Sequence, residues 1–326
     1  MLDIKFPGLG IHLKNIKDSI SIFGFEIKFY GLIIAVGFIV GFLLACKEAK
    51  RTKQSEDLYL DFLIWLVIPA ILGARLYYVI FNFGEYYSKG DSFFDVLKGV
   101  INIRNGGLAI YGGIIAGVIA AIIFCKKKKA NFFLMADTIA VGLLAGQAIG
   151  RWGNFFNREC FGGYTDSIFR MNIPVEYFSR TGNLRGLIES GSITEDMAAN
   201  LVNSDGMQWI SVHPTFLYES LWNICLILFI VLYRKHKKFD GEIGLLYLWG
   251  YGLGRVWIEG LRTDSLMLPF GNIRVSQLLA ALCVIAASVV LVKKRMDYAR
   301  GLVKEKTIPN IELPDDSDDE NDDKDE

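Results

Sequence analysis

Residues 30–46 read YGLIIAVGFIVGFLLAC, an apolar run without a charged side chain. A run of this length crosses the hydrocarbon core of a bilayer as a helix, because a helix satisfies its own backbone hydrogen bonds in lipid. Lys47, Lys50 and Arg51 follow it directly. Since Lys and Arg collect on the cytoplasmic side of membrane proteins, the sequence predicts a membrane helix whose C-terminal end faces the cytoplasm.

Similar runs extend this prediction to the whole chain, of which 52% is hydrophobic. The predicted spans are Tyr30–Cys46, Leu58–Phe83, Leu108–Cys125, Phe132–Gly150, Thr215–Tyr233, Ile243–Trp257 and Val275–Val292. Basic clusters follow alternate spans, at Lys47–Lys53, Lys126–Lys129, Arg234–Lys238 and Lys293–Arg295. All four clusters lie on the cytoplasmic side if there are seven helices. The expected fold is therefore an all-α membrane protein with seven transmembrane helices, the N-terminus outside and the C-terminus cytoplasmic.

The chain is expected to divide into five segments. These are an extracytoplasmic N-terminal arm (1–29), helices 1–4 (30–160), an extracytoplasmic insertion of mixed structure (161–212), helices 5–7 (213–295) and a cytoplasmic, acidic, disordered tail (296–326). Within the insertion we predict a short strand at Ile173–Phe178 and a helix opened by the capping box Ser192 to Glu195. The five cysteines contain no CxxC pair, so neither a disulfide framework nor a metal cluster is expected.

Polar residues gather at the outer ends of six predicted helices when depth is assigned at about 1.5 Å per residue. They are Tyr30, Arg75, Tyr111, Arg151, Asn154, His213, Tyr218, Glu219, Arg255 and Glu259, with Arg151 and Asn154 expected just after the fourth helix. Arginines on the outer side run against the usual charge bias, so an anion such as a lipid phosphate is expected to hold them. Two alternatives remain open: Arg255 and Glu259 could pair at i,i+4 spacing, and Arg75 and Arg151 could snorkel to the interface.

Three glycine-rich motifs occur in order along the chain, at 105–113 (NGGLAIYGG), 150–159 (GRWGNFFNRE) and 250–259 (GYGLGRVWIE), with HPTFLYE at 213–219 between the last two. Together they resemble the bacterial prolipoprotein diacylglyceryl transferases, from Tyr30 to Arg262. The GRWGNFFN stretch carries most of this resemblance.

The resemblance implies transfer of a diacylglyceryl group from phosphatidylglycerol to the lipobox cysteine thiol of a prolipoprotein signal peptide. The products are a thioether and glycerol phosphate. No metal or organic cofactor and no nucleic-acid partner is implied. The enzyme would lie in the bacterial cytoplasmic (inner) membrane, surrounded by the lipid bilayer, with its active site at the level of the outer leaflet.

The resemblance also implies roles for individual residues. The candidate catalytic residues are Arg255, Tyr111 and Glu259, and the candidate phosphatidylglycerol-binding residues are Arg151, Asn154, Glu159, Tyr30, Arg75 and Tyr251. Many family members have a histidine where this chain has Tyr111, and a tyrosine with a pKa near 10 is a poor base at neutral pH. Either Tyr111 is tuned by neighbouring arginines or it only hydrogen-bonds. His213 is an alternative base, although a helix-start role beside Pro214 fits it equally well.

Two other classes of protein explain the sequence less completely. A transporter for a small anion would be expected to have polar groups at the bilayer midplane, broken helices and paired halves, which the sequence lacks. A non-catalytic membrane scaffold would explain the helices but not the outer arginines.

Overall fold

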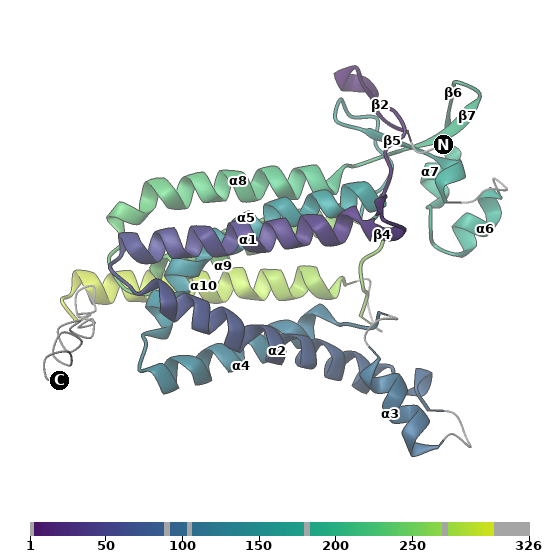
Figure 1. Cartoon of the computed structure of the whole chain (residues 1–326). Helices are drawn as coiled ribbons and strands as arrows, with labels where there is room; N and C mark the ends of the chain where they lie inside the picture. Colours follow the sequence, from purple (N-terminus) through teal and green to yellow (C-terminus); the bar gives the residue numbers. More distant parts are fainter. Residues whose placement is uncertain (1–2, 88–91, 103–105, 179–182, 269–272, 303–326) are drawn as a thin grey trace, which may run out of the picture. The chain divides into compact units, whose positions relative to one another are not determined.

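The structure, a computed structural model, describes residues 3–87, 92–102, 106–178, 183–268 and 273–302. The chain divides into two compact units, one of Met1–Ala45 and Asp137–Lys306 and the other of Cys46–Ala136 and Thr307–Glu326. Helices dominate both units (Figure 1). The predicted acidic tail lies outside the described residues from 303 onward.

All seven predicted spans are helical. The long helices are α1 (Phe29–Arg51), α2 (Glu56–Phe81), α4 (Ile110–Lys128), α5 (Phe132–Asn157), α8 (Thr215–Tyr233), α9 (Glu242–Leu261) and α10 (Val275–Ala299). Among the described residues, six helices are long and apolar enough to cross a membrane. These six are the helices named above without α9.

The end of α5 corrects one prediction. The helix continues to Asn157, so Arg151 and Asn154 lie on its last turns rather than after it. Its apolar surface continues there as well, because the rings of Trp152 and Phe155 pack on Phe216 of α8 with centroids 5.4 and 5.0 Å apart. Packing of this kind, more than local propensity, decides how far a helix extends.

The N-terminal arm and the insertion, which were expected to be separate, share one antiparallel sheet of strand order β2-β1-β5-β7-β6. Its strands are β1 (Ile4–Phe6), β2 (Ile11–Leu13), β5 (Met171–Pro174), β6 (Val202–Ser204) and β7 (Met207–Val212). The arm joins the insertion where Lys5 pairs with Asn172. Apolar side chains such as Ile4, Ile173 and Ile210 form the core beneath this sheet.

Details of the insertion also differ from the sequence prediction. The strand ends at Pro174, and Val175–Tyr177 forms a 3-10 turn (η3). The predicted helix, α7 (Glu195–Ala199), has Thr194 as its N-cap, not Ser192. Ser192 closes the preceding helix instead, because its backbone N–H donates to the carbonyl of Leu187.

Several short elements complete the chain. These are the hairpin strands β3 (Ser19–Ile22) and β4 (Phe25–Lys28), the helices α3 (Phe93–Ile101) and α6 (Leu184–Glu189), and the 3-10 turns η1 (Pro7–Leu9), η2 (Phe83–Glu85) and η4 (Arg234–His236).

Glycines allow close approach of the helices that carry the site. In the first unit, a Cβ on Gly41 of α1 would lie 2.8 Å from the carbonyl oxygen of Gly142 on α5. In the second unit, a Cβ on Gly73 of α2 would lie 2.7 Å from the carbonyl oxygen of Gly112 on α4. Small residues at such contacts are how membrane helices gain packing energy, since lipid supplies no hydrophobic drive between them.

Candidate active site

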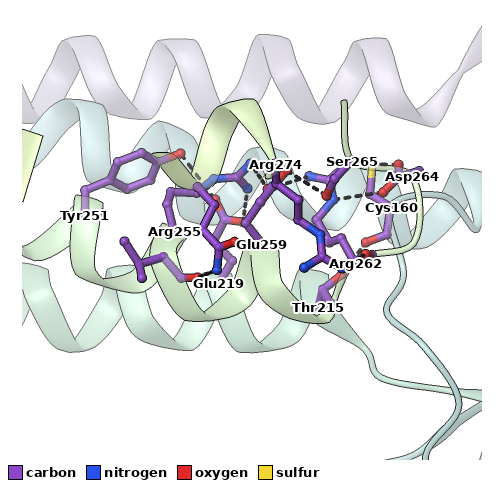
Figure 2. Close-up of polar contacts among 12 residues, drawn as sticks. Cys160, Thr215, Glu219, Tyr251, Arg255, Glu259, Arg262, Asp264, Ser265 and Arg274 are labelled. Atoms are coloured by element: carbon purple, nitrogen blue, oxygen red, sulfur yellow. Dashed lines mark hydrogen bonds and ion pairs between the residues drawn. The ribbon is translucent and has the colours of Figure 1, made fainter. Parts of the chain in front are cut away.

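Glu219 lies at the centre of a polar cluster in the first unit (Figure 2). It is in the second turn of α8 and is 2% exposed. Its Oε1 is 2.7 Å from Nη2 of Arg151 on α5, and its Oε2 accepts a hydrogen bond from Nη1 of Arg255 on α9 at 3.0 Å. One buried carboxylate therefore joins two guanidinium groups that come from two other helices.

Glu259 holds the other side of Arg255. One turn further along α9, its Oε2 pairs with Nη2 of Arg255, as the i,i+4 spacing allows. Its Oε1 accepts a hydrogen bond from the hydroxyl of Ser265 at 2.9 Å. Arg255 is thus held between two carboxylates, which set the orientation of its planar donor group.

Arg262, Asp264 and Cys160 continue the cluster beyond the end of α9 (Figure 2). Arg262 donates from Nε and Nη2 to the two carboxylate oxygens of Asp264, each at 2.9 Å. Burial alone would raise the pKa of Asp264, but hydrogen bonds from Arg262 and the Cys160 thiol hold that pKa below its usual value.

The thiol of Cys160 is not poised to react. Burial raises its pKa to about 12, although the nearby charge of Arg262 acts in the opposite direction. Since the thiolate is the nucleophilic form, Cys160 stays protonated at neutral pH.

Asn154 connects Arg151 to Glu159. Its Oδ1 is 3.4 Å from Nη1 of Arg151, and its Nδ2 donates to Oε1 of Glu159 at 2.9 Å. Glu159 in turn receives a hydrogen bond from Nδ2 of Asn157 at 3.3 Å. Asn154, Asn157 and Glu159 thus form one chain of contacts leading to Arg151.

Two tyrosines flank the arginines. Tyr251 donates from its hydroxyl to Oε1 of Glu219 at 3.3 Å, which places it beside the carboxylate that both arginines share. The ring of Tyr30, near the start of α1, lies against Gly153, where an added Cβ would be 2.8 Å from the ring. The glycine between Trp152 and Asn154 therefore makes room for Tyr30 next to the motif.

Arg75 belongs to the second unit and has a different environment. Its Nε donates to the carbonyl of Val100 at 2.7 Å. Its Nη1 donates to the carbonyls of Gly106 and Gly107, and its Nη2 donates to those of Gly99 and Asn102, all at 2.8–3.0 Å. A guanidinium has five N–H groups, and these five carbonyls match them. In this geometry the guanidinium holds the end of α3 and the glycine motif.

The two candidate bases lie in different units. Tyr111 is half-buried in the first turn of α4 in the second unit, next to Gly112 and Gly113. His213 follows β7 in the first unit, and its Nδ1 is 3.3 Å from the hydroxyl of Tyr218. Burial lowers the pKa of His213, which favours its neutral imidazole form.

The structure brings together most of the predicted site residues that belong to the first unit. Arg151, Asn154, Glu159, Tyr251, Arg255 and Glu259 are connected by the contacts above. Glu219 was expected from the sequence among the polar residues at the outer helix ends, but its role as the carboxylate that Arg151 and Arg255 share was not predicted. Cys160, Arg262, Asp264 and Ser265 were not predicted as site residues either, because they have no helical periodicity to mark them.

Internal carboxylates, rather than an external anion alone, hold the arginines of this cluster. The sequence suggested that an anion from outside was needed, but Glu219 serves both Arg151 and Arg255. The contacts named above use two donor groups of each arginine, and a guanidinium has five N–H groups. The Arg151 side chain is 20% exposed. The arrangement can therefore present oriented donors to a phosphate that approaches from outside the cluster.

The chain is similar to known proteins over most of its length. The family model described as prolipoprotein diacylglyceryl transferase matches residues 17–293. The phosphatidylglycerol–prolipoprotein diacylglyceryl transferase of Finegoldia magna is 40% identical to this chain over 88% of the chain and 98% of that protein. The proteins of the same name from Clostridioides difficile and Bacillus cereus are each 39% identical, over 85% and 87% of this chain and 96% and 94% of those proteins. Since the match covers most of the chain and nearly all of each relative, the chain belongs to the prolipoprotein diacylglyceryl transferase family.

Proposed function

We propose that this chain transfers the diacylglyceryl group of phosphatidylglycerol to the lipobox cysteine of a prolipoprotein, the first step of lipoprotein maturation. The observation that carries the proposal is the pair Arg151 and Arg255 on one buried carboxylate. Both arginines lie within the residues that the family model matches. The names of this chain's relatives describe this transfer.

The reaction is a substitution at carbon. The substrate sulfur attacks the carbon of the diacylglyceryl group that bears the phosphate. A C–S bond forms there, and the bond between this carbon and the phosphate oxygen breaks. Glycerol phosphate leaves with the bonding electron pair, and the thiol proton passes to a base or to solvent. Negative charge grows on the phosphate oxygens as the bond breaks, so oriented cationic donors there lower the barrier.

Arg151 and Arg255 supply those donors. An arginine presents a planar fork that fits two phosphate oxygens at once, which a lysine cannot do. Glu219 keeps the two guanidinium groups close together despite their like charge, and Glu259 orients Arg255 from its other side. Asn154 and Glu159 position Arg151, and Tyr30 and Tyr251 lie at headgroup level.

Proton transfer is assigned to Tyr111, with His213 as the alternative base. Gly112 and Gly113, next to Tyr111, pack against α2, since a Cβ on Gly112 would clash with the carbonyl oxygen of Gly73. The substrate thiol would therefore approach the Tyr111 hydroxyl from another side. Arg75, predicted to bind phosphatidylglycerol, serves in this proposal to hold the glycine motif that precedes Tyr111, since its donors meet backbone carbonyls.

The proposed topology has seven membrane helices, with α9 as the sixth span, the N-terminus outside and the C-terminus in the cytoplasm. The basic clusters at the ends of alternate helices support it. The sheet formed by the N-terminal arm and the insertion then lies outside, and the active site lies at the outer leaflet of the bacterial cytoplasmic membrane.

Reconstitution tests the proposal directly. The purified protein is placed in liposomes containing phosphatidylglycerol with a labelled diacylglyceryl group, together with a peptide that carries a lipobox cysteine. We expect the label on the peptide and free glycerol phosphate in equal amounts. Arg151→Ala should abolish both products while insertion and thermal melting stay normal. Anion flux without lipid transfer to the peptide would instead identify a transporter.

A further inference from the structure

The hairpin β3–β4 has one polar face and one apolar face. In its register Ser19 pairs with Lys28 and Ser21 with Glu26. Paired residues point to the same side of a sheet, so this side is polar, and the Ser19 hydroxyl donates to Glu26 at 2.8 Å. The opposite side consists of the pairs Ile20 with Ile27 and Ile22 with Phe25.

The apolar face is open. Its four side chains are between 40% and 77% exposed, and Phe23 at the tip is 98% exposed. A two-stranded hairpin is marginally stable in water, and an exposed apolar face makes it less favourable still. The hairpin is therefore built for a surrounding that is not water.

The turn shows the same preference. Phe23 and Gly24 both have positive φ, 50° and 81°, the geometry of a two-residue turn that favours Asn-Gly. A bulky side chain at positive φ is strained. The residue at the tip is nevertheless phenylalanine rather than asparagine, and contacts within the hairpin do not stabilise its ring, which is almost fully exposed.

The chain itself locates this hairpin at the membrane surface. β4 leads without a break into α1, a candidate membrane span (Figure 1). The backbone N–H of Phe29, the first residue of α1, donates to the carbonyl of Asp18 at 2.8 Å, which closes the base of the hairpin on the helix. The tip residue Phe23 is six residues before Phe29, and six extended residues span about 20 Å, so the tip cannot lie farther than that from the start of α1.

We propose that the hairpin β3–β4 is a membrane anchor that lays Ile20, Ile22, Phe25 and Ile27 on the lipid and inserts Phe23 at the boundary of headgroups and acyl chains. Its polar face then meets water and headgroups. Amphipathic elements at an interface bury their apolar side in this way. The anchor fixes the first turn of α1, where Tyr30 lies against Gly153 of the active-site motif. Only the choice of the outer leaflet rests on the proposed topology.

The depth of the tip can be measured on the whole protein in lipid nanodiscs. A trifluoromethyl-phenylalanine is placed at position 23, and its fluorine relaxation is compared under oxygen, which partitions into lipid, and under a water-soluble nickel chelate. The matched control carries the same probe at Val202, a 39% exposed apolar residue in β6 of the five-stranded sheet. We expect oxygen to dominate at position 23 and nickel at position 202.

A probe at position 23 that behaves like the one at 202 would show that the hairpin stands in water and would overturn the proposal. Shielding from both reagents would also overturn it, since protein would then cover the tip. If the probe at position 23 is shielded from both reagents only after a precursor peptide is added, the apolar face of the hairpin binds that peptide instead of lipid, which also overturns the proposal.

A second variant separates anchoring from folding. Phe23→Asn introduces the residue that the turn prefers, so melting in detergent should be unchanged or higher. With the probe moved to position 25, we expect Phe23→Asn to lower the ratio of oxygen to nickel relaxation several-fold. An unchanged ratio would contradict the anchor. Neither measurement depends on transfer activity, so failure of the anchor and failure of the proposed reaction are distinguishable.

Discussion

At the scale of single residues, the site depends on where carboxylates meet guanidinium groups. Arg151 and Arg255 carry like charge and would repel one another at close range. The buried carboxylate of Glu219 lies between them and offers one oxygen to each. The geometry of the donors, more than the number of charges, is therefore what substitutions at this site will disturb.

Arg255→Lys should reduce transfer about 10²–10³-fold, as removal of one oriented donor to a developing charge commonly does. Lysine keeps the charge but cannot bridge Glu219 and Glu259 with a planar fork. The measurement is kcat with labelled phosphatidylglycerol, with thermal melting as the control for folding. A fully active lysine variant would show that Arg255 contributes only charge.

Glu219→Gln should impair transfer and raise the KM for phosphatidylglycerol, since glutamine has nearly the same shape but lacks the negative charge that attracts both guanidinium groups. The matched control is Glu26→Gln, an exposed carboxylate of the hairpin's polar face. If both variants have wild-type kinetics, the shared carboxylate does not position the arginines.

Tyr111→Phe should be strongly impaired, and Tyr111→His should be active. Phenylalanine keeps the ring and removes only the hydroxyl, and general acid–base contributions are about 10²–10⁴-fold. Turnover is compared between pH 6 and 9, roughly the range that brackets thiol ionisation. Near wild-type turnover of the phenylalanine variant would assign Tyr111 to the aromatic belt and direct the search for the base to His213 or solvent.

At the scale of elements, close helix contacts determine where the motifs lie. α1 and α5 approach through Gly37 and Gly41 on one side and Gly142 and Gly146 on the other, with backbone against backbone. These positions are four residues apart on each helix, so all four glycines face the same seam. The same helix α5 that forms this contact carries Arg151 near its C-terminal end.

Gly41→Ala should therefore lower the melting temperature, because the new Cβ would lie 2.8 Å from the carbonyl oxygen of Gly142. The control is Gly31→Ala on the same helix, where nothing lies within 4 Å of an added Cβ. Alanine in an open helical position should keep or slightly raise stability. Equal melting temperatures for the two variants would mean that the seam is not tight.

At the scale of the whole molecule, the site and the basic clusters can be compared within the first unit. The candidate site lies at the C-terminal ends of α5 and α9 and the N-terminal end of α8, whereas basic clusters lie at the C-terminal ends of α8 and α10. The acidic tail begins after a cytoplasmic cluster in the proposed topology, so a bilayer separates it from the site.

Truncation after Pro309 should leave specific activity unchanged. The removed segment NIELPDDSDDENDDKDE has only Ile311 and Leu313 as large apolar residues with which to pack against the rest of the chain. Turnover per folded molecule is measured for the full chain and the truncated one. A large loss would place the tail, or the C-terminus, on the same side as the reaction.

The sequence by itself determined which segments form the seven long helices, the expected orientation, the family and most of the charged residues at the site. Hydropathy and charge bias act on each segment separately, so they can be read without knowing its neighbours. The motif at 150–159 adds residue types whose chemistry is specific even before their positions in space are known.

Only the tertiary structure decided which groups are partners. Glu219 is 68 residues from Arg151 and 36 from Arg255 along the chain (219 − 151 and 255 − 219), and Arg75 holds carbonyls 24–32 residues away. The N-terminal arm likewise pairs with a strand beyond residue 170. Periodicity reports only neighbours within a few turns, whereas the energy of a buried charge depends on whatever group the fold brings within hydrogen-bond distance.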